Sequence, residues 1–167
     1  MNNLEILQER LPDYARDLRL NLRTVLTVDS APGLNAQQIW ALAFASAQAA
    51  RNRELYAAIE QAAGTQVDAP YQRAAMTAAA VTGMNKLYQR FLHLVEDAEY
   101  SGMPARLRMN AIANPGVPQG DFGLLSFAVS TINGCGPIHR DGAGGLIFLA
   151  LPAGQRHGYK KRTRAIS

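Results

Sequence analysis

Cysteine is nearly absent from this chain, because Cys135 is the only one among 167 residues. A single thiol cannot close an intramolecular disulfide, so the sequence excludes a disulfide-stabilised scaffold and agrees with a reducing compartment. Histidine is also scarce, and neither His93 nor His157 shows the spacing that zinc sites use. We therefore expect no bound metal and no bound cofactor.

Long hydrophobic runs are missing as well, although 48% of the residues are hydrophobic. No apolar run reaches the roughly 18 residues that a membrane-spanning helix needs. The first residues, MNNLEILQER, have neither the basic nor the apolar region of a signal peptide. We expect a cytoplasmic protein without membrane contact and with one sizeable core. The aromatic side chains assigned to that core are Trp40, Phe44, Phe91, Phe122 and Phe127.

Acidic side chains are almost absent after residue 135. In that part of the chain Asp141 is the only acidic residue, and six residues are basic. Residues 1–135 carry eleven Lys and Arg against twelve Asp and Glu, so the formal net charge of +4 comes from the C-terminal end. This shift predicts a domain over 1–137 and a divergent Gly/Arg-rich tail over 138–167. A solvated tail explains the charge better than nucleic-acid binding, because no binding fold accompanies it. We expect no nucleic-acid partner.

Strand-like alternation is also absent, and the chain before Cys135 shows helical periodicity instead. Asn35 and Gln38 form a capping pair, and Asn3 and Asn52 are placed to cap two further helices. Gly83 marks an expected bend in an alanine-rich segment that Pro70 opens. The small side chains of this segment predict that neighbouring helices pack closely against it. The fold class is predicted to be all-α. The expected helices cover 4–11, 13–26, 36–50, 52–63, the segment from 70 to the bend, 87–98 and 122–132.

The expected helix over 13–26 has one apolar and one basic face. Arg16, Arg19 and Arg23 lie on the basic face, and the spacing of three and four residues predicts that the opposite face packs inward. The side chains of that apolar face are Tyr14, Leu18, Leu22 and Val25.

The last expected helix leads directly to Cys135. Asp121 is expected to cap it, and Asn133-Gly134 is a stop signal because both residues tolerate the left-handed conformation that ends helices. If another helix begins at Cys135, its first-turn amides lower the thiol pKa and favour the reactive thiolate. A buried, inert thiol is the alternative reading of a lone cysteine.

Four segments carry a resemblance, namely LPDYARDLRLNL (11–22), GMNKLYQRF (83–91), LRMNAIANPGVP (107–118) and SFAVSTINGCG (126–136). They are similar to the AhpD family of alkyl hydroperoxidases, a branch of the carboxymuconolactone-decarboxylase-like superfamily. The similarity is spread over residues 1–137. It implies an AhpD-like helical bundle that forms homotrimers.

The resemblance also implies an antioxidant thiol oxidoreductase with peroxidase activity. Members reduce alkyl hydroperoxides and pass electrons from the reduced lipoyl group of a dihydrolipoyl acyltransferase-type protein to the peroxiredoxin AhpC. Their redox-active centre is a Cys-x-x-Cys pair, with a His four residues after the second Cys and a Glu twelve residues before the first. One thiolate attacks the peroxide, and the neighbouring thiol donates a proton and resolves the adduct.

Most of that centre has no counterpart in this chain. Cys135 matches the first cysteine, whose role is proton donor and disulfide partner. Ile138 stands where the second cysteine would be, Gly142 at the histidine and Gly123 at the glutamate. His139 is out of register. The resemblance therefore predicts an AhpD-type enzyme that is impaired in this chain, with a non-catalytic relic or self-associating scaffold as the alternative.

The tail over 138–167 departs from the resemblance as a whole. Because similarity stops within three residues of Cys135, we hypothesise that the tail is read out of frame and that an intact gene restores a cysteine at position 138. Sequencing the gene across this region tests the idea. Loss of the helices that the family places here exposes apolar surface comparable in free energy to the stability of a domain. We expect a chain that aggregates or depends on oligomer contacts.

Overall fold

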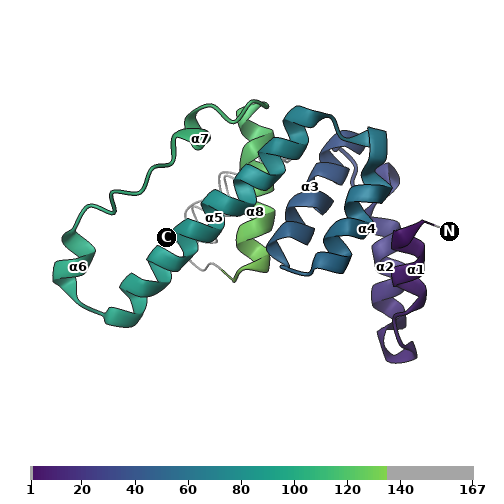
Figure 1. The fold of residues 1–167 in the computed structure, drawn as a ribbon, viewed down its shortest axis with the longest axis horizontal. Helices are drawn as coiled ribbons and strands as arrows, with labels where there is room; N and C mark the ends of the chain where they lie inside the picture. The colour runs from purple at the N-terminus through teal and green to yellow at the C-terminus, as the bar shows by residue number, and fades with distance from the viewer. Residues whose placement is uncertain (1, 135–167) are drawn as a thin grey trace, which may run out of the picture.

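The computed structural model describes residues 2–134, and every regular element among them is helical. Figure 1 shows the arrangement, which confirms the predicted all-α class. Short 3-10 turns precede α2, α3 and α5. The α-helices are α1 (Asn3–Glu9), α2 (Arg16–Val25), α3 (Ala36–Ala49), α4 (Arg53–Ala63), α5 (Ala69–Val95), α6 (Ala98–Gly102), α7 (Asn110–Ala113) and α8 (Gln119–Ile132).

Side-chain caps begin the central helices as the sequence predicts. The Asn35 side chain accepts from the Gln38 amide at 2.9 Å, and the Asn35 amide donates to Oε1 of Gln38 at 2.9 Å, which completes a capping box on α3. Asn52 caps α4 in the same way through the Leu55 amide. The prediction for α1 was wrong by one residue, because Asn2 and not Asn3 is its cap. Such caps contribute about 1 kcal/mol each.

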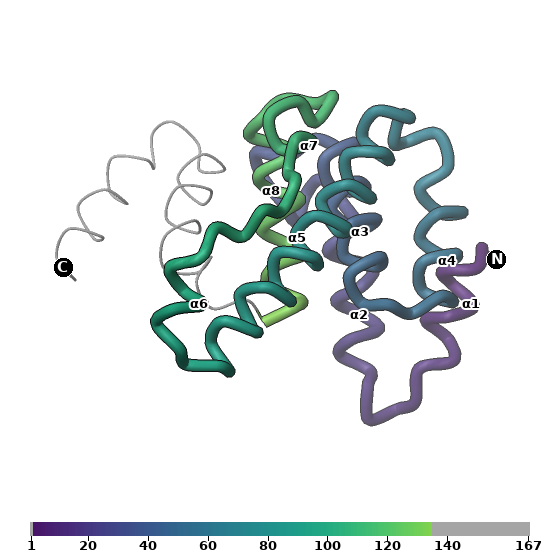
Figure 2. Tube along the Cα trace, turned by 60° about the vertical axis from the view of Figure 1, so that its left-hand side comes forward, coloured from purple at the N-terminus to yellow at the C-terminus, as the bar shows by residue number. Residues whose placement is uncertain are grey.

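The core lies where α3, α5 and α8 pack together, with α4 against α3 and α1 against α4 (Figures 1 and 2). The first half of α5 brings three fully buried alanines to this contact, Ala74, Ala75 and Ala78. Their small side chains let the neighbouring helix axes approach, as predicted from the alanine density. The larger buried side chains around them are Phe44, Ile59, Val67, Phe122, Leu125 and Val129.

Helix α5 continues through Gly83 without a break, so the expected bend there is wrong. Glycine lowers helix propensity by about 1 kcal/mol, which is too little to end a long helix whose first half is anchored in the core. The helix ends at Val95, and Glu96 follows it with a positive φ of 52°. No helix among residues 2–134 is both long and apolar enough to cross a membrane.

Two expected core faces lie at the surface of the single chain. Helix α2 has no buried residue; Tyr14 is 93% exposed and Leu18 64% exposed, so only part of its apolar face packs inward. Phe91, assigned to the core from sequence, is 47% exposed. It belongs to a row along the second half of α5 that we call the α5 stripe, formed by Leu87, Phe91, Leu94 and Val95.

Candidate functional site

Cys135, the predicted reactive residue, lies outside the described residues, as do Ile138, Gly142 and the tail over 138–167. The structure describes the segment that leads to Cys135. Helix α8 ends at Ile132, where the Asn133 amide donates to the Val129 carbonyl at 3.0 Å. Gly134 follows with φ +65°, a conformation that favours glycine. The predicted helix stop is thus confirmed, and it sets the direction in which the chain enters position 135.

The helix before Cys135 is anchored firmly in the core. Phe122, Leu125 and Val129 are at most 3% exposed, and they hold one side of α8 against α3 and α5. Ser130 is also buried, and its Oγ has no hydrogen-bond partner among residues 2–134. Gly123, at the position of the relay glutamate in the resemblance, lies half-buried on α8. It brings no carboxylate to this helix.

A hydrogen-bond cluster joins the first turns of α3, α5 and α8. Asp121 accepts from the hydroxyl of Tyr71 through Oδ2 and from Nε2 of Gln38 through Oδ1, the latter at 2.8 Å. The prediction that Asp121 caps α8 is therefore wrong, because α8 begins earlier, after Pro118, and Asp121 bonds across to the other helices. Burial, and then the hydrogen bond to Asp121, raise the pKa of Tyr71 to about 12.

This cluster was not found from the sequence. At 1.5 Å per residue, Asp121 is about 16 Å along α8 from the end that leads to Cys135. The cluster therefore positions the start of α8 against α3 and α5. Among the described residues, no group of three His, Cys, Asp or Glu side chains is placed to hold a metal ion.

Replacing Tyr71 with phenylalanine should lower the free energy of unfolding by about 1–2 kcal/mol, because Asp121 loses a hydrogen-bond donor. Since folding raises the Tyr71 pKa, the bond stabilises the protein fully below pH 10 and this contribution is lost as pH rises toward 12. Urea unfolding at pH 8 and pH 11.5 measures both effects. A matched control is Tyr88→Phe, whose hydroxyl makes only a 3.5 Å contact to the Met103 carbonyl. Equal losses in the two variants would contradict this role for Tyr71.

Comparison with known proteins gives the same assignment as the resemblance. Alkyl hydroperoxide reductase AhpD of Coxiella burnetii is 50% identical over 133 residues, which cover 80% of this chain and 75% of the relative. AhpD of Rhodospirillum centenum is 50% identical over 134 residues, or 80% of this chain and 70% of the relative. AhpD of Frankia alni is 52% identical over 130 residues, or 78% and 69%. No family model matches the chain.

An all-helical fold and this degree of identity define the class, a helical oxidoreductase. The chain belongs to the alkyl hydroperoxide reductase AhpD family. The resemblance found in the sequence is thereby confirmed.

Proposed function

We propose that this chain is an antioxidant thiol oxidoreductase of the AhpD type, with Cys135 as its reactive thiol. The observation that carries the proposal is 50% identity over 133 residues to relatives named alkyl hydroperoxide reductase. Helix α8 and its stop at Asn133-Gly134 support it, because sites built next to elements that are buried in the core are positioned more precisely than sites on loops.

With one cysteine, the chemistry runs through intermolecular steps. The Cys135 thiolate attacks the terminal peroxide oxygen, the O–O bond breaks, and the alcohol leaves after protonation, so that the cysteine becomes a sulfenic acid. One thiol of a dihydrolipoyl group then displaces water to form a mixed disulfide. Its second thiol displaces the Cys135 thiolate and closes the lipoyl disulfide. Because no second cysteine resolves the adduct within the chain, we expect turnover below that of a Cys-x-x-Cys enzyme.

The partners in this proposal follow from family membership. A dihydrolipoyl acyltransferase-type protein supplies the reduced lipoyl group, and the peroxiredoxin AhpC receives electrons. Both reactions are thiol–disulfide exchanges, which suit the cytoplasmic location expected from the sequence. No bound cofactor is part of the proposal.

A peroxide-consumption assay driven by reduced lipoamide tests the proposal. The unmodified chain should consume an alkyl hydroperoxide faster than the uncatalysed reaction, and Cys135→Ser should abolish the difference, because serine forms no thiolate. If the unmodified chain shows no turnover, the alternative of a non-catalytic relic or scaffold replaces this function.

The proposal includes self-association into a homotrimer. Its support in this chain is the α5 stripe, whose Leu87 and Leu94 are 64% and 69% exposed. Phe91 of the stripe meets Tyr100 edge-to-face at 5.8 Å, so α6 continues the apolar surface. Contiguous exposed apolar residues of this kind mark interaction surfaces.

Leu87→Asp should shift the chain to monomers, because a trimer would bury the new carboxylate in an apolar contact. Light scattering coupled to size-exclusion chromatography measures the mass. His93→Asp is the matched control, since it adds the same side chain at an exposed site of α5 outside the stripe. A trimer that persists in Leu87→Asp, or one that dissociates equally in His93→Asp, would argue against the stripe as the contact.

A further inference from the structure

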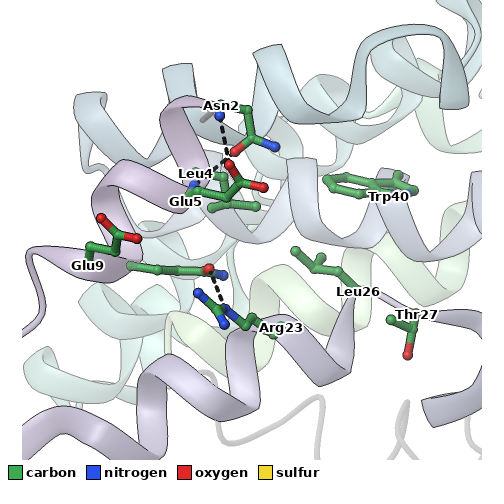
Figure 3. A pocket seen from close by; sticks show the side chains of 9 residues that line it. Asn2, Leu4, Glu5, Glu9, Arg23, Leu26, Thr27 and Trp40 are labelled. Carbon is green, nitrogen blue, oxygen red and sulfur yellow. Dashed lines mark hydrogen bonds between the residues drawn. The ribbon is translucent and has the colours of Figure 1, made fainter.

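An open pocket of about 490 Å³ lies between α1, α2 and the start of α3 (Figure 3). Its apolar surface comes from Leu4, Leu26 and Trp40, one residue from each of these parts of the chain. In Figure 3, Leu26 and Trp40 lie next to each other at one end and Arg23 lies below Leu4 and Glu9. The volume falls within the range of small-molecule sites.

Hydrogen-bond donors converge on the pocket. Gln8 lines it although this residue is only 3% exposed, and its Oε1 accepts from Nε of Arg23 at 3.1 Å. That bond fixes the orientation of both side chains. The Nε2 amide of Gln8 and the terminal nitrogens of Arg23 have no hydrogen-bond partner among residues 2–134. Donors held in place beside an apolar surface match a ligand that carries acceptor oxygens.

The acidic side chains of the pocket limit the charge of such a ligand. Glu5 is already engaged, because it accepts from the Asn2 amide at 3.0 Å in the capping box of α1. Glu9 is exposed and has no hydrogen bond or ion pair among the described residues. Glu5 and Glu9 outnumber Arg23 in the lining, so they repel any anion, and they repel a doubly charged one such as a phosphate monoester about twice as strongly. A single carboxylate can offset this repulsion by direct hydrogen bonds from the terminal nitrogens of Arg23.

We propose that this pocket binds a singly charged carboxylate that carries an apolar chain. The carboxylate accepts from the terminal nitrogens of Arg23 and from Nε2 of Gln8, and the apolar chain covers Leu4, Leu26 and Trp40. The site is independent of Cys135 and does not rest on the proposed peroxidase function. A free medium-chain carboxylic acid and the C-terminal carboxylate of an apolar peptide share this chemistry.

Titration of the full chain with octanoate tests the proposal. Trp40 is the only tryptophan, so its fluorescence reports on the pocket, and calorimetry detects binding that leaves the fluorescence unchanged. Octanoate should bind saturably, with octanol and octyl phosphate each at least about tenfold weaker, because the first lacks the charge and the second carries too much. The second ligand to be titrated is an acetylated tripeptide ending in leucine. If the peptide binds more tightly than octanoate, the site is assigned to the C-terminal carboxylate of peptides. No saturable binding of either carboxylate, or equal binding of octanol, would overturn the proposal.

Two variants are expected to change octanoate affinity in opposite directions. A folding defect would weaken binding in both, so the pair separates a binding effect from a folding effect. Arg23→Gln should weaken octanoate binding about tenfold by removing the charged donor. Glu9→Gln should strengthen it about twofold, because a nearby like charge disappears without loss of a described contact. Arg16→Gln, at an exposed position of α2 that does not line the pocket, is the matched control and should change nothing. Weaker binding in Glu9→Gln would contradict the assignment even if Arg23→Gln fails to fold.

Discussion

Replacing Ile138 with cysteine should raise lipoamide-driven peroxide turnover at least about tenfold, because it restores the Cys-x-x-Cys spacing with Cys135. In the family arrangement the second cysteine attacks the peroxide and the first resolves the sulfenic acid. Resolution then becomes intramolecular, at an effective concentration in the millimolar range or above. Oxidation should also produce a disulfide within one chain, seen by mass spectrometry as the loss of two hydrogens.

The controls separate a new thiol from a new polar side chain. Ile138→Ser adds a hydroxyl without nucleophilic sulfur, and it should leave turnover unchanged. The double variant Ile138→Cys with Cys135→Ser can form a sulfenic acid but cannot resolve it within the chain. Its turnover should therefore drop from that of Ile138→Cys to about that of the unmodified chain. If Ile138→Cys is no faster than Ile138→Ser, restoring the spacing is not sufficient for faster turnover, and other residues of the tail are also needed.

Phe44→Ala should lower the free energy of unfolding by about 3–5 kcal/mol, the typical cost of emptying a buried aromatic site. Phe44 is 2% exposed, and its ring meets Tyr56 edge-to-face at 5.1 Å. The fully buried Ala41 and Ala45 on the same helix are too small to fill the cavity. Because a domain is stable by only about 5–15 kcal/mol, this one change should bring the chain close to unfolding at moderate temperature.

Urea unfolding monitored by circular dichroism measures this loss. Phe91→Ala is the matched control, because it deletes the same side chain at a site that is 47% exposed, and it should cost about 1 kcal/mol or less. Both variants are compared in the Leu87→Asp background, so that self-association does not contribute. Losses of equal size would contradict the placement of Phe44 in the core and of Phe91 at the surface.

Local signals in the sequence predict the helices well. Asn35 with Gln38, and Asn52, cap helices through bonds to amides three residues on, which any local sequence window contains. The alanine density of α5 predicts close packing for the same reason, because small side chains permit it whatever the partner helix is. The stop at Asn133-Gly134 needs only the left-handed conformation of Gly134.

Non-local features are where the predictions fail. The apolar face of α2 and Phe91 have the spacing of core residues, but periodicity shows only that a face seeks burial and not that the same chain covers it. Gly83 lies inside a helix because its cost of about 1 kcal/mol is too small to end a helix whose first half is buried against α3 and α8. Asp121 has the composition of a cap, yet its partners, Tyr71 and Gln38, are 50 and 83 residues away.

The candidate site divides in the same way. Cys135 and Ile138, which stands where the second cysteine of the pair would be, belong to one contiguous motif. Both positions can therefore be proposed from the sequence alone. The pocket beside Trp40 cannot be predicted, because Gln8, Arg23 and Trp40 come from three segments without a shared motif. Only the tertiary packing of α1, α2 and the start of α3 brings them together.

The hydrogen-bond cluster on Asp121 also bears on the order of folding. Its bonds close loops of 50 and 83 residues, and the entropy of such closure is recovered only when the intervening helices are largely in place. We therefore expect the cluster to form after the folding transition state. Its bonds should then slow the unfolding of the native chain and leave the folding rate almost unchanged, so Asp121 should mainly lengthen the time for which α8, the helix that leads to the single thiol, stays in place.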